Sequence, residues 1–327
     1  MAAKKSRFIT QLEVEKQPKH NLTHEIYNAV LPEVAHKPMI IPKSDSVMLR
    51  LKEICEVGFS PSALTSYIRN PIDFYFQKIL RIKEVEEVEE NIALNTLGTI
   101  IHKTLEALYR PLIGEILTES DIQNCFKLLD DEVFKQFKEV YKEGEIKKGK
   151  NLLAFEVAKR NVTNFLKMEL EAIKSGDTIK ILALEQTYSR NLKHKNLPFE
   201  VLIKGNVDRI EERNGCIRII DYKTGKVESK NLALRTWNGL SNDIKNDKII
   251  QILAYAYMFD NKTEMLLEAG IISFKNLKAG FMPFSFKADK VSNSIINDAV
   301  IDNYLNEIVI LLSEILDKNI PFEEKIL

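Results

Sequence analysis

An Asn-Gly pair at residues 214 and 215 constrains the fold of this chain more than any other feature of its sequence. Asn-Gly between two runs of alternating apolar and polar residues is typical of a type I′ turn, which joins two antiparallel strands through a two-residue loop. The stretch GNVDRIEERNGCIRIIDYKTG, residues 205–225, has this pattern. We therefore predict a β-hairpin centred on this turn.

Two aspartates, Asp208 and Asp221, lie at equal distances from the turn. Equidistant positions of such a hairpin are paired, so the two Cβ atoms are expected about 4.5–5.5 Å apart on one face. Lys223 follows Asp221 at the next position on the same side, because side chains alternate along a strand. On the opposite face the same register pairs Glu211 with Arg218, an attractive combination.

Opposed carboxylates destabilise a hairpin unless a shared proton, a cation or solvent offsets their repulsion. Solvent is a poor explanation here, because Ile210, Ile217 and Ile219 share this face and predict that it is partly buried. Paired carboxylates suit Mg²⁺, and a neighbouring lysine can stabilise developing negative charge or orient a water molecule. The alternative is an exposed hairpin with ordinary surface charges, and a β-bulge would change the register. The hairpin residues alone leave both interpretations open.

The order of the other periodic segments predicts an α/β protein. Helical patterns come first, beginning at Ser60-Pro61, an N-cap followed by proline, and a strand cluster, a helix, further strands and a last helix follow. This order predicts a mixed β-sheet core flanked by helices, with an added helical region over about 111–175. The expected strands are 180–189, 199–207, 216–222, 269–274 and 281–286, and the expected helices include 72–80, 95–108, 246–259 and 295–316.

The first 55 residues differ from the rest, because they are rich in proline and show no sustained period. We expect an extended or partly helical leader over 1–55, with order beginning near Phe59, and one folded domain over 56–327. Two charged segments, 84–90 and 142–151, are expected to be solvated loops.

The composition limits the cellular setting and the partners. The chain has 47 basic and 47 acidic residues, so its net charge gives no indication of a nucleic-acid partner and any basic surface must be local. No apolar run reaches the length of a membrane span, and residues 1–6 do not lead into the apolar segment of a signal peptide. The three cysteines are far apart and lack CxxC spacing, which is typical of reduced thiols. We expect a cytoplasmic protein without a membrane partner.

Several other residues are candidates for a site, each with an ordinary structural alternative. His102 lies in the 95–108 helix, where a lone histidine is commonly a core or boundary residue. Gln251 and Tyr255 are one helical turn apart, which also fits a polar boundary position beside a core aromatic. Glu185 lies in an expected strand and could simply face solvent. The sequence has no phosphate-binding loop, GxSxG elbow or HExxH motif, which argues against the chemistries that those motifs support.

Five motifs, in order, resemble those of the RecB/AddB-type nuclease domains of the PD-(D/E)XK superfamily. The resemblance extends over about residues 59–310 and favours the functional interpretation of the candidate residues. The similar segments are FSPSALTSYIRNPIDFYFQKIL, LGTIIH with Gly98 and His102, GNVDRI with Asp208, DYKTG with Asp221 and Lys223, and QILAY with Gln251 and Tyr255.

The resemblance implies a restriction-endonuclease-like fold and metal-assisted hydrolysis of phosphodiester bonds. The implied cofactor is Mg²⁺, for which Mn²⁺ can substitute. The resemblance implies that the metal ligands are His102, Asp208, Asp221 and the carbonyl group of Tyr222. It implies that Lys223 stabilises the transition state or positions the attacking water, and that Gln251 and Tyr255 support the site and the DNA strand. Glu185 is implied to be an accessory acid.

Several similar nucleases carry an iron–sulfur cluster held by four cysteines, one just before the proline of the first motif and three after QxxxY. Asn70 occupies the first of these positions, and no cysteine follows Cys216. Because such a cluster needs cysteine thiolates, we predict that this chain has none.

The implied partner is DNA, either single-stranded or at its ends, with the 111–175 region and basic residues lining a single-strand channel. The segment SRFITQLE is similar to the end of a helicase part, so we expect a carboxy-terminal piece of a helicase–nuclease in double-strand break repair, acting with a helicase subunit or a covalently linked helicase domain. The alternatives are a non-catalytic DNA-binding or scaffolding domain and a stand-alone Cas4-like or phage-type exonuclease. The basic residues expected in the channel are Arg69, Lys147, Lys148 and Lys226.

Overall fold

The computed structural model describes residues 5–15, 17–21, 23, 37–82, 92–141, 146, 148–288 and 291–326. The chain divides into two compact units, Met1–Lys37 and Pro38–Leu327. In the first unit, helix α1 (Arg7–Val14) begins at Ser6, whose hydroxyl accepts a hydrogen bond from the Phe8 N–H. The acidic segment 84–90 and Lys147 lie outside the described residues.

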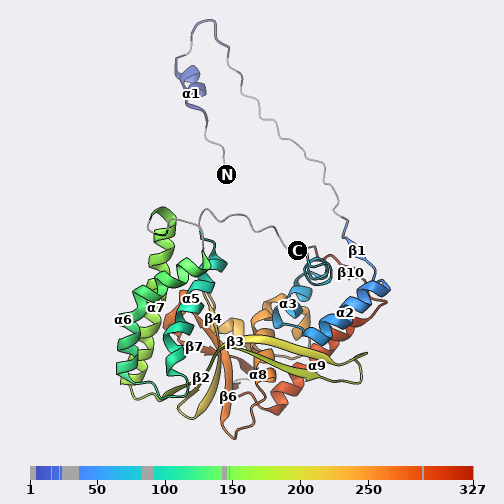
Figure 1. Cartoon of the computed structure of the whole chain (residues 1–327). Coiled ribbons are helices and arrows are strands. Elements are labelled where there is room, and N and C mark those ends of the chain that lie inside the picture. Colours follow the sequence, from blue (N-terminus) through green and yellow to red (C-terminus); the bar gives the residue numbers. More distant parts are fainter. Residues whose placement is uncertain are drawn as a thin grey trace. The chain divides into compact units, whose positions relative to one another are not determined.

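The second unit is built on a five-stranded mixed sheet with the order β2-β3-β4-β6-β7 (Figure 1). Neighbouring strands are antiparallel except for β4 and β6, which are parallel and are joined through helix α8 (Asp247–Phe259). The predicted α/β class and mixed sheet are therefore confirmed. The strands are β2 (Ile179–Leu192), β3 (Val201–Arg213), β4 (Cys216–Lys223), β6 (Leu266–Ser273) and β7 (Phe281–Pro283).

The hairpin of β3 and β4 has the predicted turn and register. Arg209 pairs with Ile220, and the pairing continues without a shift to the turn. Asn214 and Gly215 both have positive φ, 53° and 78°, as a type I′ turn requires. The register prediction is therefore confirmed, and it carries Asp208 and Asp221 to facing positions at the far end of the hairpin.

The opposite face of the hairpin differs from the prediction in its ion pairs. Glu211 and Arg218 are register partners, as expected. However, the Arg218 guanidinium pairs with Glu268 on β6, at 3.1 Å, and Glu211 lies against Arg209 on its own strand. The predicted facing positions of Glu211 and Arg218 are therefore confirmed, but the closest ion pair of Arg218 is with Glu268, because β6 offers a second carboxylate on the other side of β4.

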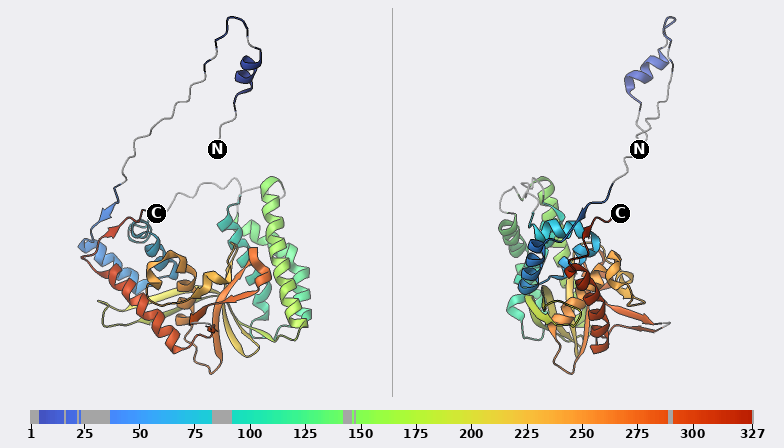
Figure 2. Two further views of the ribbon diagram at one scale, coloured as in Figure 1. Left: turned by 180° about the vertical axis from the view of Figure 1, so that it is seen from behind. Right: turned by 90° about the vertical axis from the view of Figure 1, so that its right-hand side faces the viewer.

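Helices cover both faces of the sheet and form a hydrophobic core on each (Figures 1 and 2). One core contains α8 and the buried faces of α2, α3 and α9, and the other contains α5, α6 and α7. The α6–α7 pair is the added helical region that the sequence predicts. These helices are α2 (Asp45–Val57), α3 (Pro61–Arg69), α5 (Leu94–Tyr109), α6 (Glu119–Val140), α7 (Gly149–Lys174) and α9 (Asp298–Leu316).

Ordered structure begins earlier than expected, so the prediction that order begins near Phe59 is wrong. Helix α2 is capped by the Ser44 hydroxyl and buries Leu51 and Cys55, which lie one turn apart on its inner face. The proline-rich sequence before it obscured this helical pattern. Strand β1 (Ile40–Ile41) pairs with β10 (Phe322–Glu323), a contact between the two ends of the unit that no local pattern could reveal.

Smaller elements also refine the prediction. The first motif continues through α4 (Pro71–Phe74) into a π-helical turn (Tyr75–Ile79). The single strand expected over 281–286 is two strands, β7 and β8 (Ser285–Ala288), of which β8 belongs to a separate three-stranded sheet with β5 (Ala233–Leu234) and β9 (Val291–Asn293).

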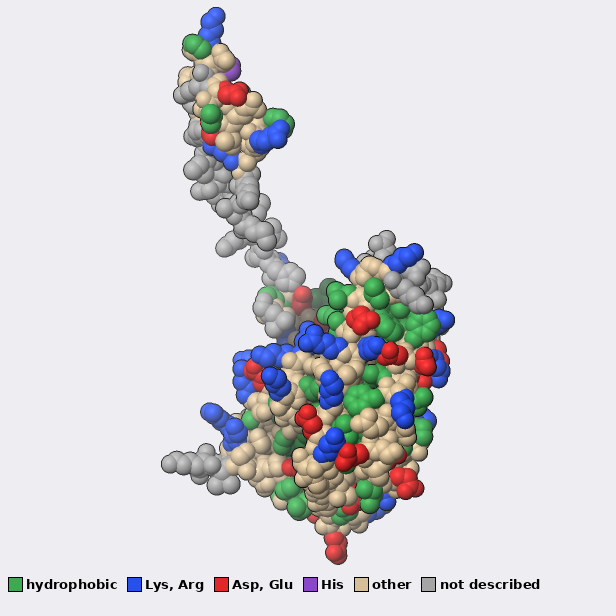
Figure 3. Space-filling view, turned by 90° about the vertical axis from the view of Figure 1, so that its left-hand side faces the viewer, with side chains coloured by type: hydrophobic (Ala, Val, Ile, Leu, Met, Phe, Trp, Pro, Cys, Tyr) green, Lys and Arg blue, Asp and Glu red, His purple; other side chains and the backbone are tan. Residues whose placement is uncertain are grey.

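The surface is mixed in character. On the face shown in Figure 3, lysine and arginine side chains are interspersed with acidic and hydrophobic ones. Within the described part of the chain, no helix combines the length and the apolar character that crossing a bilayer requires.

Candidate active site

Three acidic side chains lie in a row across neighbouring strands of the sheet. The registers of β2 with β3 and of β3 with β4 place Glu185, Asp208 and Asp221 side by side. Glu185 has φ of 44°, in the left-handed region that residues other than glycine seldom adopt. Asp208 and Asp221 are 9% and 2% exposed, so the two facing carboxylates are largely withdrawn from solvent. The exposed-hairpin alternative is therefore wrong.

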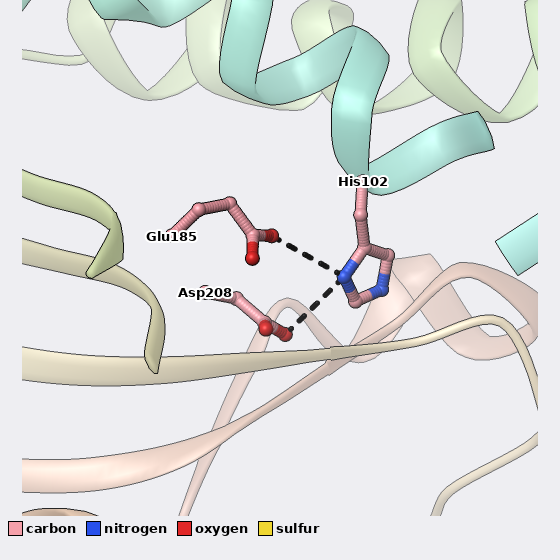
Figure 4. Close-up of side chains that lie close together, drawn as sticks. All are labelled: His102, Glu185 and Asp208. Carbon is pink, nitrogen blue, oxygen red and sulfur yellow. Dashed lines mark ion pairs between the residues drawn. The ribbon is translucent and has the colours of Figure 1, made fainter. Parts of the chain in front are cut away.

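His102 reaches this row from helix α5 (Figure 4). Its Nδ1 atom lies 3.6 Å from Oε1 of Glu185 and 3.6 Å from Oδ2 of Asp208. Each of the three residues offers one ligand atom, and these three atoms all lie within 4.8 Å of one another. A nitrogen and two carboxylate oxygens at this spacing could hold a metal ion.

Asp221 is held by side chains on its other side. Nε2 of Gln251 donates hydrogen bonds to Oδ1 of Asp221, at 3.0 Å, and to the Tyr255 hydroxyl, at 2.8 Å. The Lys223 ammonium lies 2.7 Å from Oδ2 of Asp221. This ion pair offsets the charge of the buried Asp221 oxygen. The Asp221 carboxylate, beside that of Asp208, is of the chemical type that a hard divalent cation prefers.

The Tyr222 backbone also contacts the carboxylates. Its N–H donates to Oδ2 of Asp208 at 2.7 Å, which orients that carboxylate. Its ring lies edge-on to the His102 ring, with 5.7 Å between centroids. The structure thus brings His102, Glu185 and Asp208 together and places Asp221, Tyr222 and Lys223 next to them, with Gln251 and Tyr255 behind Asp221.

The electrostatic balance of the site favours cation binding. Burial, and then the nearby charge of Asp221, raise the pKa of Asp208 to about 7. Burial alone would lower the pKa of His102, but the hydrogen bond to Glu185 and the charges of Asp208, Glu185 and Asp221 outweigh it and raise that pKa. For Lys223, burial is likewise outweighed by Asp221, so its pKa is raised and the ammonium stays protonated. The raised pKa values indicate that this cluster of carboxylates favours added positive charge.

Sequence reasoning missed a residue that orients Glu185. Nδ2 of Asn206 donates to Oε2 of Glu185 at 2.5 Å. Asn206 lies two residues before Asp208 on β3, so the two side chains share a face of the sheet. The alternation of side chains along β3 was the signal available in the sequence. The contact with Glu185 could not be predicted, because it depends on the register between β2 and β3, which no turn of recognisable type sets.

Gly205 allows the helices around the site to approach β3. A Cβ atom at this position would lie 3.0 Å from Cε of Met258, 3.2 Å from Cε1 of Tyr255 and 3.3 Å from Cδ of Pro61. We expect Gly205→Ala to destabilise the protein by about 1–3 kcal/mol, because overpacking forces shifts in neighbouring groups. We also expect it to displace Tyr255 and so disturb the hydrogen bond between Gln251 and Tyr255. Urea unfolding measures the loss of stability.

Gly98 is the matched control. A Cβ atom there would first meet Oγ1 of Thr224 at 3.4 Å, an ordinary contact. Gly98→Ala in helix α5 is therefore expected to be neutral or to stabilise by up to about 1 kcal/mol, from helix propensity. Equal behaviour of the two variants would contradict the close-packing role of Gly205.

A five-stranded mixed sheet flanked by helices on both faces is consistent with a restriction-endonuclease-like fold. Residues 58–325 match the family model of the PD-(D/E)XK nuclease superfamily, and the chain belongs to this superfamily. Its nucleases are typically dependent on divalent metals, and the His102, Glu185 and Asp208 group could bind one.

A curated relative is described only as an uncharacterized protein, from Rickettsia bellii (strain RML369-C). It is 25% identical over 172 residues, which cover 52% of this chain and 19% of the relative. The chain therefore corresponds to a small part of the length of this relative.

Proposed function

We propose that this chain is a Mg²⁺-dependent deoxyribonuclease that acts as an exonuclease. The observation that carries the proposal is the convergence of His102, Glu185 and Asp208 beside the Asp221–Lys223 pair. Oxygen-rich ligand sets with one imidazole accept Mg²⁺ and Mn²⁺. A bound divalent cation would supply Lewis-acid stabilisation of the charge on a phosphodiester and lower the pKa of a bound water molecule.

Each protein group has a separate role in this proposal. His102, Asp208, Asp221 and the carbonyl group of Tyr222 would hold the cation, with Glu185 as an accessory acid. The Lys223 ammonium, which stays protonated and is 32% exposed, would stabilise developing negative charge or orient the attacking water. Gln251 and Tyr255 keep the Asp221 carboxylate in one orientation through the hydrogen bonds described above.

The partners and the pathway are the less direct part of the proposal. The motif resemblance supports a RecB/AddB-type nuclease that acts with a helicase subunit or a linked helicase domain in double-strand break repair. The limited share of the Rickettsia relative that matches agrees with a nuclease segment of a larger protein. We propose that Arg69 and Lys226, both exposed, contact the phosphates of a single strand.

The test is digestion of linear single-stranded and double-stranded DNA in the presence of Mg²⁺, Mn²⁺ or EDTA. We expect progressive shortening of at least one substrate with either metal and no cleavage with EDTA. Cleavage that persists in EDTA would refute the metal mechanism. Tight DNA binding without cleavage under any metal would instead favour the scaffolding alternative.

The pH dependence of metal binding follows from Asp208. The pKa of Asp208 is raised from 3.8 to about 7 in the folded, metal-free protein. Its contribution to folding stability is therefore fully present below pH 3.8, the pKa of the unfolded chain, and is lost as the pH rises through about 7. A cation replaces the proton, so we expect Mg²⁺ to raise the melting temperature more at pH 8 than at pH 6. The apparent affinity should be about tenfold higher at the upper pH. Differential scanning fluorimetry across a Mg²⁺ series measures both, and an affinity independent of pH would contradict the assignment.

A further inference from the structure

Arg209 follows Asp208 on strand β3, and its side chain points to the opposite face of the sheet. The guanidinium is completely buried, at 0% exposure. Nη2 donates to Oε1 of Glu169 at 2.9 Å, and Nη1 donates to Oε2 of the same residue at 3.3 Å. Nη2 also lies 2.6 Å from Oε2 of Glu211. A fully buried, bidentate pair therefore links the strand that carries Asp208 to helix α7.

The Glu169–Arg209 ion pair also contacts helix α5, the helix that carries His102. The Tyr109 hydroxyl, seven residues after His102, donates to Oε2 of Glu169 at 2.5 Å. The Arg209 guanidinium lies over the Tyr109 ring, 5.0 Å from its centroid. The carboxylate of Glu169 thus fixes α5 and β3 to each other, and these are the two elements whose side chains meet at Nδ1 of His102 and Oδ2 of Asp208.

A second line of contacts runs through Tyr222 on β4. Nη1 of Arg209 donates to the Tyr222 hydroxyl at 3.4 Å. The ring of Tyr222 also contacts the His102 ring, and the Tyr222 backbone N–H donates to Asp208. A chain of direct contacts through Tyr222 therefore connects Arg209 to both residues, in addition to the link from Glu169 to helix α5.

Stability alone does not explain buried charges at this place. Replacing a buried ion pair by apolar side chains of similar volume is often neutral or stabilising. What a bidentate guanidinium–carboxylate pair provides in addition is fixed geometry. Fixed geometry is needed here, because the residues of the candidate metal group come from separate elements.

We propose that Glu169 and Arg209 are positioning residues that set the separation of His102 and Asp208 and so determine the affinity for the divalent cation. This inference rests on the proposed function, since it concerns the same site. Both side chains are buried, at 2% and 0% exposure, so we assign neither a contact with the cation or the DNA. Both act from the far face of the sheet.

The test is Mn²⁺ binding by isothermal titration calorimetry to the chain and to Glu169→Gln, which keeps the shape of the side chain and removes its charge. The matched control is Val162→Ala, a fully buried position on the same helix and in the same core, outside the ion pair. We expect Glu169→Gln to bind Mn²⁺ about 10–100-fold more weakly, and Val162→Ala to bind as the unmodified chain does although it is less stable.

A Glu169→Gln affinity that matches the control overturns the inference. If Glu169→Gln does not fold, Tyr222→Phe decides, because it removes only the hydroxyl that Arg209 contacts. Weaker Mn²⁺ binding by Tyr222→Phe then supports the inference, and unchanged binding overturns it. An unmodified chain that binds no Mn²⁺ and cuts no DNA refutes the proposed function itself, and the inference fails with it.

Discussion

Replacing Asp208 with asparagine is expected to reduce DNA cleavage by about 10³-fold or more. A catalytic metal ion supplies several kcal/mol of transition-state stabilisation, and each 1.36 kcal/mol is about a factor of ten in rate. Asp208 contacts His102 and the Tyr222 N–H and faces Asp221, so its carboxylate is central to the site. An amide keeps the shape but loses the charge that a divalent cation requires.

The variant should remain folded, which separates this prediction from a stability effect. The pKa of Asp208 is raised to about 7, mainly by burial, so at pH 8 the native charge is unfavourable in the metal-free protein. Asp208→Asn should therefore melt at the same or a higher temperature than the unmodified metal-free chain. Glu200→Gln, at a position 49% exposed and just before β3, is the control and should cleave normally. Retention of more than a tenth of the activity by Asp208→Asn would remove Asp208 from the mechanism.

Replacing Arg209 with methionine is expected to cost about 3–5 kcal/mol of folding stability, since it leaves buried carboxylates without their partner. Glu169 and Glu211 are 2% and 1% exposed, and both lie against this guanidinium. In a chain of marginal stability, such a loss produces partial unfolding. The midpoint and the slope of urea unfolding measure it.

Arg218→Met provides the comparison on the neighbouring strand. Arg218 is 25% exposed and pairs with Glu268, so its removal should cost only about 0–1 kcal/mol. If Arg209→Met lowers the free energy of unfolding by no more than Arg218→Met does, the buried ion pairs of Arg209 do not stabilise the fold as predicted. Such a result would leave the cleavage prediction for Asp208 untouched.

The hairpin was predictable because its information is local. A two-residue turn sets the pairing of every residue outward from it, so the facing positions of Asp208 and Asp221 followed from the sequence. The helix pattern likewise placed Gln251 and Tyr255 on one face, and they are joined by a hydrogen bond in the structure. His102 was connected to the hairpin only through the motif resemblance, since no spacing relates a helix to a strand so far along the chain.

What the sequence did not reveal depends on contacts between distant segments. Glu169 and Arg209 are an ordinary glutamate and an ordinary arginine until α7 packs on the sheet and excludes water from both. The position of Asn206 beside Glu185 depends on the register of β2, which contains a shift between Ile181 and Ala183. Strands β1 and β10 are too short to give a pattern, and they exist because they pair with each other.

The strand order gives the residues of the site unequal freedom to move. Asp221 lies on β4, which is bonded to a strand on each side, whereas Glu185 lies on β2 at the edge of the sheet. Of the three acidic residues in the row, Glu185 is also the residue with a positive φ angle. A carboxylate on an edge strand can shift without breaking a ladder on both sides, so we expect adjustment to cations of different radius to involve Glu185 more than Asp221. Amide exchange should accordingly be faster around Glu185 than around Asp221.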